Sequence, residues 1–221
     1  MRIVRRALAG VALLSALLCS GQRQVTGESR PCPGPAATAT AAADVVTVES
    51  SAGHRPQTAT GFLVAPRRVV TVAHAVEGAT GPPVVSSDRT GPMPARLLVV
   101  DMRRDLAVLD VPALQTGGLL PAASASPPGA CAAVLVERSD RAQKVPALIR
   151  RSVRITIDVP VPAERGALEL AAEIGRGDSG APVIDASGLV EGVVFAASRD
   201  GRATAWAVSA SELRGLLADN G

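Results

Sequence analysis

The chain is poor in aromatic residues. Its 221 residues include no tyrosine, one tryptophan and two phenylalanines, so alanine, valine, leucine and isoleucine must fill the core. The length suffices for one domain with a substantial core. Without aromatic side chains on which bases can stack, the sequence gives no sign of a single-strand nucleic-acid binder.

Net positive charge outside the N-terminus is also lacking. Arg2, Arg5 and Arg6 precede the first acid, Glu28, and account for the whole formal charge of +3. The remaining chain is neutral, with Lys144 as its one lysine. Since nucleic-acid binding needs net basic surface, we expect no nucleic-acid partner.

Histidine and cysteine are scarce as well. The two histidines, His54 and His74, have no metal-ligand spacing, so we expect no metal and no cofactor. Of the three cysteines, Cys19 lies at the end of an export signal. If it leaves with that signal, Cys32 and Cys131 remain as a disulfide candidate in an oxidising compartment. The alternative is that Cys131, in an apolar run, is a buried thiol.

The N-terminus has the pattern of a signal peptide. A basic start, Met1–Arg6, precedes the apolar run Ala7–Leu18 and small residues suited to cleavage, which predicts a signal over residues 1–21. We therefore expect a secreted, periplasmic or cell-envelope protein, with membrane attachment only if this segment is retained or lipidated. Residues 22–43, rich in Ala, Pro and Thr, are predicted to be a flexible tail.

Short β-branched runs recur from Asp44 onward, separated by Gly, Pro, Ser and Asp. They form two groups, over about 44–114 and about 130–208, joined by the connector Gln115–Gly129. This pattern predicts an all-β fold of two six-to-seven-stranded antiparallel β-barrels, with the active site in the cleft between them. A short C-terminal helix is expected over about 210–218, after Ser209.

Three motifs carry the chemistry. His74 lies in Thr71–Ala75, Asp105 precedes the apolar run Leu106–Leu109, and Ser179 lies in the glycine-rich turn Gly177–Pro182. A histidine that takes the serine proton, and an aspartate that orients the histidine, form a hydrolytic triad. Gly177 would let the turn aim its N–H inward, forming an oxyanion hole with the N–H of Ser179.

Each residue taken alone has a simpler interpretation. His74 could be a turn histidine, Ser179 a turn residue and Asp105 a surface acid, while Asp101 or Asp110 could fill the aspartate role. Asp105 is preferred because it immediately precedes an apolar strand. The order His, Asp, Ser excludes an α/β-hydrolase esterase, whose order is Ser, Asp, His.

The motifs resemble a known family. Thr71–His74 and Gly177–Gly180 are similar to the histidine and serine boxes of trypsin-like, chymotrypsin-fold serine proteases, and Asp105–Leu109 is closer to the HtrA/DegP branch. Arg176–Asp185, continued by Gly192–Phe195, is most similar to the periplasmic protease domain of MarP-type proteases. The resemblance spans about residues 44–217 and implies peptide hydrolysis through an acyl-enzyme.

The sequence departs from the family at two points. Ala181 stands where the trypsin-like serine box has a second glycine. No Ile-Val-Gly-Gly-like activation sequence is present, so Asp178 is expected to have no new amino terminus to pair with. The first departure leaves an alternative to an active endopeptidase: a latent or inactive protease-fold module that binds peptides or proteins.

The resemblance also points to a substrate pocket. By trypsin-like spacing Glu173 would favour a basic P1 residue, the residue before the cleaved bond, whereas by HtrA-like spacing Ile174 would favour a small aliphatic one. Ala196 completes the expected pocket. We predict a protein or peptide substrate with a small or aliphatic P1 residue.

Overall fold

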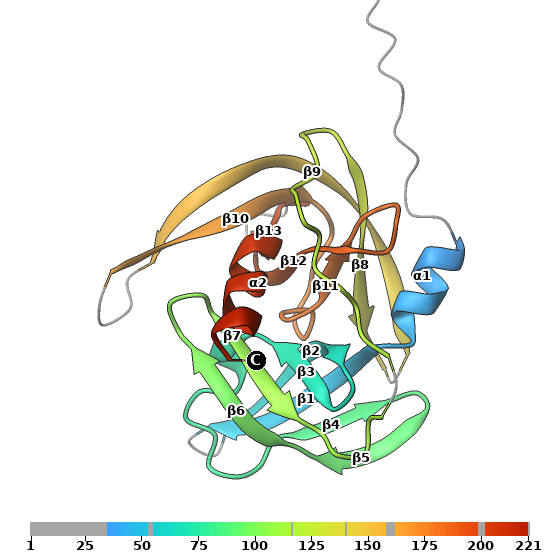
Figure 1. Cartoon of the computed structure of the whole chain (residues 1–221), viewed down its shortest axis with the longest axis vertical. Helices are drawn as coiled ribbons and strands as arrows, with labels where there is room; N and C mark the ends of the chain where they lie inside the picture. The colour runs from blue at the N-terminus through green and yellow to red at the C-terminus, as the bar shows by residue number, and fades with distance from the viewer. Residues whose placement is uncertain are drawn as a thin grey trace, which may run out of the picture.

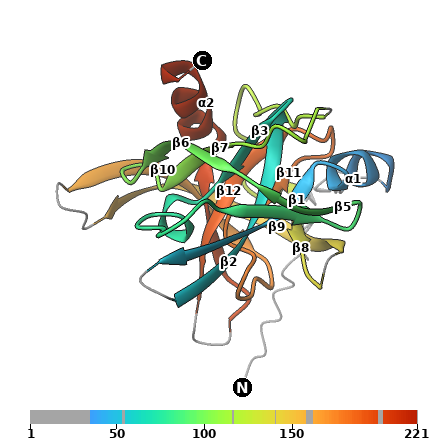
Figure 2. The ribbon, with the colours of Figure 1, turned by 90° about the horizontal axis from the view of Figure 1, so that it is seen from below.

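The structure is a computed structural model that describes residues 35–52, 55–115, 117–139, 141–157, 162–198 and 202–220. Two β units pack against each other, with one helix beside the barrel and the C-terminal helix over the junction (Figure 1 and Figure 2). No helix within these ranges is long and apolar enough to cross a membrane.

The first unit is an antiparallel sheet of seven strands. In hydrogen-bonded order they run β5-β4-β1-β2-β3-β7-β6. The strands are β1 (Val45–Ala52), β2 (Arg55–Ala65), β3 (Arg68–Thr71), β4 (Val84–Ser87), β5 (Thr90–Pro94), β6 (Arg96–Asp101) and β7 (Leu106–Asp110).

The second unit is a closed antiparallel barrel of six strands in the order β10-β13-β12-β11-β8-β9. Its long strand β9 pairs with both β8 and β10 and so closes the ring. The strands are β8 (Cys131–Glu137), β9 (Ala142–Ile157), β10 (Ala163–Ala171), β11 (Pro182–Ile184), β12 (Val190–Ala197) and β13 (Ala205–Ser209).

The predicted fold of two six-to-seven-stranded antiparallel units with a short C-terminal helix is confirmed. One detail differs, because the first unit is a half-barrel whose end strands, β5 and β6, do not close the ladder. Pro92 and Pro94 explain the open edge at β5, since proline has no N–H to donate to another strand.

The core is built from small aliphatic side chains. Gly61 on β2 shows how tightly they pack: an added Cβ would lie 2.8 Å from Val48 Cγ2 and 2.9 Å from Val69 Cγ1. One buried cluster joins the two units, with Phe62 and Leu106 from the sheet packing with Ile184 from the barrel. The line where the units meet is therefore a packed interface.

The end of the predicted flexible tail is folded instead. Pro35–Ala42 forms helix α1, which contacts β8 and β9 and buries Ala41. The alanine-rich run explains the helix, since alanine is the best helix former and proline is favoured at the first helical position. The flexible-tail prediction is therefore wrong for residues 35–42.

The C-terminal helix, α2 (Ala210–Asp219), agrees with its predicted range to one residue. It buries Ala210, Leu213 and Leu216, and the two leucines belong to the cluster that joins the two units. Ser209 occupies the N-cap position, but its hydroxyl is hydrogen-bonded to that of Ser211 at 2.8 Å and does not cap the helix backbone.

Several predictions lie outside the described residues. These are the signal peptide over 1–21, the tail up to residue 34, His54 and the two cysteines Cys19 and Cys32. Cys131 is the first residue of β8 and is half-buried. The Cys32–Cys131 bridge therefore stays a prediction.

Candidate active site at the junction of the two units

His74 lies on the 3₁₀ turn η1 (Ala73–Ala75), directly after β3. The neighbours Ala73 and Ala75 are buried and anchor the turn, whereas the His74 side chain is 45% exposed. The sequence thus places the imidazole at the surface while its backbone is fixed to the core of the first unit.

Asp105 holds the histidine through three contacts. Its Oδ1 and Oδ2 each lie 3.0 Å from His74 Nδ1, and Oδ1 also accepts a hydrogen bond from the His74 backbone N–H at 3.0 Å. The Asp105 backbone is in the left-handed region, with φ of 56°, a conformation that Asp tolerates better than most residues. A proton on Nδ1, donated to the carboxylate, leaves Nε2 unprotonated and able to act as a base.

The two competing aspartates have other partners. Asp101 accepts hydrogen bonds from the backbone N–H groups of Arg103 and Arg104 and pairs with the Arg104 guanidinium. Asp110 pairs with Arg67, which lowers the pKa of Asp110. Among the acids of this segment, Asp105 is therefore the one placed beside His74.

The turn that carries Ser179 is hydrogen-bonded to the first unit. The Thr60 N–H on β2 donates to Ser179 O at 2.8 Å, and the Thr60 hydroxyl donates to Gly177 O at 2.9 Å. Gly180, with φ of 91°, passes so close to Thr60 that an added Cβ would lie 1.9 Å from the Thr60 carbonyl oxygen. Only glycine allows this approach.

Thr60 also connects the serine turn to the histidine strand. The buried hydroxyl of Thr71, three residues before His74, donates to Thr60 O at 2.8 Å. The serine turn, β2 and the end of β3 thus form one hydrogen-bonded unit. Sequence reasoning missed the role of Thr60, because these contacts span 11 to 117 residues and leave no local pattern.

We expect Thr71→Val to lower both stability and kcat/KM. The valine has nearly the shape of threonine but leaves the buried Thr60 carbonyl without this donor, at a cost of about 1–2 kcal/mol. The measurements are thermal unfolding and peptide hydrolysis, with the exposed Thr58→Val on β2 as the matched control. Equal kcat/KM for Thr71→Val and Thr58→Val would contradict the proposed link between the serine turn and β3 through Thr60.

Asp178 has a cation as its partner. It is fully buried and accepts from Arg138 Nε at 2.9 Å, from Arg138 Nη2 and from the Gly175 N–H at 2.7 Å. The hydrogen bond to Asp178 raises the pKa of Arg138 above its ordinary value. Where trypsin-like activation would need a new amino terminus, a side chain from the β8–β9 hairpin supplies the positive charge.

Gly177 and Ser179 are the residues predicted to form the oxyanion hole. Gly177 has φ of 88°, which glycine adopts at low cost, and Ser179 follows two residues later. In the part of the chain that the structure describes, neither backbone N–H has a hydrogen-bond partner. Two free N–H groups beside a serine hydroxyl can stabilise an alkoxide that develops on a carbonyl oxygen.

Beside the serine turn lies a cavity of about 460 Å³. The predicted pocket residues Glu173 and Ile174 both line it, but Ala196 does not, and Ala197 takes its place. Successive residues of a strand point to opposite faces, so the prediction, which was off by one position, named Ala196 instead of Ala197. The remaining lining is small, apart from Arg138 and Arg202.

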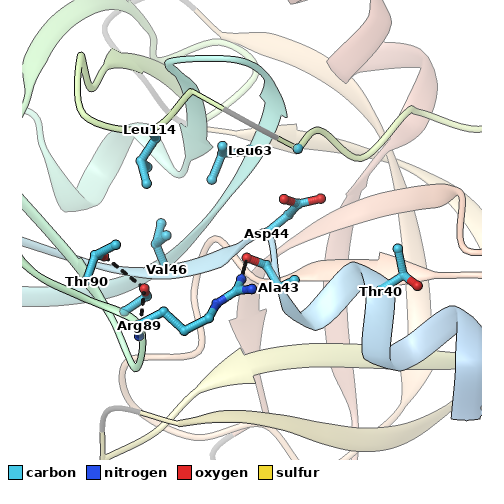
Figure 3. A pocket seen from close by; sticks show the side chains of 10 residues that line it. Thr40, Ala43, Asp44, Val46, Leu63, Arg89, Thr90 and Leu114 are labelled. Carbon is cyan, nitrogen blue, oxygen red and sulfur yellow. Dashed lines mark hydrogen bonds between the residues drawn. The ribbon is translucent and has the colours of Figure 1, made fainter.

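A second cavity of about 460 Å³ lies between α1, β1 and the β4–β5 hairpin, away from these residues (Figure 3). Arg89 donates to the carbonyl oxygen of Ala43 across it, and Asp44 accepts from the Gly118 N–H at 3.1 Å. Burial raises the pKa of Asp44. These contacts join α1 and the connector to the sheet, and none of the predicted site residues lines this cavity.

The fold and the junction define the class of protein. Two antiparallel β units with this arrangement have the chymotrypsin-like fold. Residues 59–193 match the family profile of the trypsin-like peptidase domain. The chain therefore belongs to the family of trypsin-like serine peptidases.

Among curated proteins, the chain is 36% identical over 167 residues to the serine protease Rv3671c of Mycobacterium tuberculosis, covering 73% of this chain and 42% of the relative. Serine protease MT3772 of another strain of that species matches to the same extent. The chain thus spans less than half the length of these relatives. The predicted resemblance to trypsin-like and MarP-type proteases is confirmed.

Solved structures agree. The active form of the Rv3671c protease superposes with a TM-score of 0.77 at 31% identity, covering 96% of this chain and 95% of that one. The inactive form gives 0.72 at 33% identity, covering 87% and 98%. A serine endoprotease from Yersinia pestis, at 17% identity and a TM-score of 0.69 over 83% of this chain and 64% of that one, shares the fold alone.

Proposed function

We propose that the protein is a secreted or periplasmic serine endopeptidase that uses His74, Asp105 and Ser179 as a catalytic triad. The observation that carries the proposal is the triple contact of Asp105 with His74, in a chain whose serine turn is hydrogen-bonded to the same unit through Thr60. Membership of the trypsin-like peptidase family supports it.

The proposed reaction is acyl transfer to Ser179 with His74 as the base. Ser179 Oγ attacks the substrate carbonyl carbon while its proton passes to His74 Nε2, and the new oxyanion accepts hydrogen bonds from the Gly177 and Ser179 N–H groups. The imidazolium, stabilised by Asp105, then returns the proton to the leaving amine, so that the C–N bond breaks and an acyl-enzyme remains. Water then attacks the acyl carbon while its proton passes to His74 Nε2. The imidazolium returns this proton to Ser179 Oγ, so that the ester C–O bond breaks and the carboxylic acid product is released.

Ala181 is compatible with this activity. Its methyl group is fully buried in the barrel core, while its N–H donates to Asp178 O at 3.0 Å and its carbonyl accepts from the Val194 N–H at 2.9 Å. The extra methyl therefore fits without breaking the backbone contacts of the serine turn. Ala181 was the reason for considering a protease-fold module that binds peptides without turnover, and this reason is now weaker.

The pocket favours a small or aliphatic P1 residue. Ile174 and three alanines, Ala172, Ala197 and Ala203, give it an apolar lining that suits a small or aliphatic side chain. We expect digestion of a denatured protein mixture, followed by mass spectrometry of the new termini, to give internal cleavages mainly after Ala, Val, Ser or Leu. Cleavage mainly after Lys and Arg would overturn this preference and would indicate that Glu173 binds a basic P1 side chain.

Export and the disulfide belong to the same proposal. The signal over residues 1–21 would deliver the chain to an oxidising compartment, where a Cys32–Cys131 bridge would close a loop of roughly 100 residues and contribute about 4–5 kcal/mol at most. We expect non-reducing peptide mapping of the exported protein to yield one linked Cys32–Cys131 peptide, and reduction to lower Tm. Quantitative alkylation of both thiols without reductant would exclude the bridge.

A further inference from the structure

Arg165 is a buried cation that the proposed mechanism does not use. It lies on β10, is 3% exposed, and places Nη2 3.7 Å from Asp105 Oδ2. Its guanidinium carbon lies 4.4 Å from the centre of the Phe195 ring. Within the described residues, Nε and Nη1 are buried without a hydrogen-bond partner. The side chain is thus held by charge and ring contact while two donors remain unpaired.

The other charge facing Arg165 comes from α2. Glu212 interacts electrostatically with Arg165, accepts a hydrogen bond from the Gly166 N–H at 2.8 Å and lies 3.4 Å from Arg104 Nε. Arg104 in turn pairs with Asp101 and Asp219. Burial lowers the pKa of Arg165 and both carboxylates raise it, but a guanidinium stays protonated at any pH at which the protein is folded. A row of alternating charges therefore links the C-terminal helix to Asp105.

We propose that Arg165 is a positioning residue of the triad, which orients the Asp105 carboxylate and offsets part of its negative charge. Its attraction also opposes rotation of a side chain whose backbone is in the left-handed region. An apolar side chain of the same length would fill this site without leaving two buried donors unpaired, so packing alone does not account for arginine here.

The consequence concerns the pH range of activity, and it rests on the proposed function, in which His74 is the general base. A carboxylate stabilises the imidazolium beside it, and a cation 3.7 Å from that carboxylate weakens the effect. Removing the Arg165 charge is therefore expected to favour the protonated form of His74 and to move the acid limb of activity to higher pH.

The kinetic test is the pH dependence of kcat/KM for the full chain and its variants. We expect Arg165→Met to move the midpoint of the acid limb upward by about 0.5–1 pH unit, while Arg165→Lys, which keeps the charge, stays near the wild type. Arg154→Met is the matched control. Arg154 lies opposite Gly166 in the β9–β10 ladder, one position from Arg165, but its side chain is 73% exposed. We expect that variant to leave the profile unchanged.

A second readout does not depend on turnover. In His54→Gln/Ser179→Ala protein, His74 is the one remaining histidine, so an NMR titration follows a single imidazole. We expect Arg165→Met in this background to raise the titration midpoint by the same amount as in the kinetics. A folded Arg165→Met protein that titrates at the same midpoint as its parent would overturn the proposal, whether or not Ser179 proves to be the nucleophile.

If Arg165→Met does not fold, the same NMR titration of the Glu212→Gln variant tests the proposal. Glutamine keeps an acceptor for the Gly166 N–H but removes the second carboxylate that shares Arg165. The Arg165 charge then acts more fully on Asp105, and we expect the imidazole midpoint to move downward. An unchanged or raised midpoint would contradict the proposed charge balance.

Discussion

Replacing Ser179 by alanine is expected to abolish peptide hydrolysis, with kcat falling by about 10⁴–10⁶-fold. The change removes the oxygen that the proposed mechanism acylates. The Ser179 contact that the structure describes, from the Thr60 N–H to its carbonyl oxygen, is made by the backbone and survives the substitution. Tm should therefore stay within about 1–2 °C of the wild type, because a half-buried hydroxyl contributes little to stability.

The measurements are casein hydrolysis and thermal unfolding of the two proteins side by side. Ser187→Ala, an exposed serine in the turn between β11 and β12, is the matched control and should keep full activity. Casein cleavage by Ser179→Ala at the wild-type rate would remove Ser179 from the mechanism. A large loss of Tm would instead assign it a structural role.

Arg138→Gln is the second substitution with a large expected effect. It leaves the buried Asp178 carboxylate without its cation, next to the two N–H groups proposed for the oxyanion. Breaking a fully buried ion pair costs about 3–5 kcal/mol. Because the Arg138 side chain is 37% exposed, water screens the pair, and a cost of about 1–3 kcal/mol is the better expectation.

The effect on activity should exceed the effect on stability. A displaced Asp178 would move the Ser179 N–H, and losing one oxyanion donor costs about 10²–10³-fold in kcat. Steady-state kinetics test this, with Arg141→Gln, an exposed arginine of the same hairpin, as the control. In Arg138→Gln/Asp178→Asn, which buries no unpaired charge, part of the stability should return. Wild-type kcat in folded Arg138→Gln would contradict the assignment.

Local patterns explain what could be predicted from the sequence. Alternating β-branched runs and glycine-rich turns indicate strands and their ends, and the two groups of runs correspond to the half-barrel and the barrel. The three motifs also lie at strand ends, where a turn can expose a side chain. His74 and Asp105, 31 residues apart, indeed meet because β3 and β7 pair directly.

What the sequence does not reveal are contacts between side chains from different elements. Arg138 and Arg165 look like ordinary strand or hairpin arginines, and their meaning depends on carboxylates 40 and 60 positions away. Thr60 is equally inconspicuous in β2. Ala196 and Ala197 differ by one position, and only the strand register decides which faces the cavity. Helix α1 was missed because alanine-rich composition also occurs in flexible tails.

The most direct test of the central claim, that Ser179 is an activated nucleophile, is labelling with a fluorophosphonate probe and mapping of the adduct by mass spectrometry. The probe phosphonylates serines whose proton a neighbouring base can take. We expect one adduct, on Ser179, that is lost in His74→Ala and strongly reduced in Asp105→Asn. A folded, oxidised protein that remains unlabelled, or labelling that persists in His74→Ala, would contradict the triad.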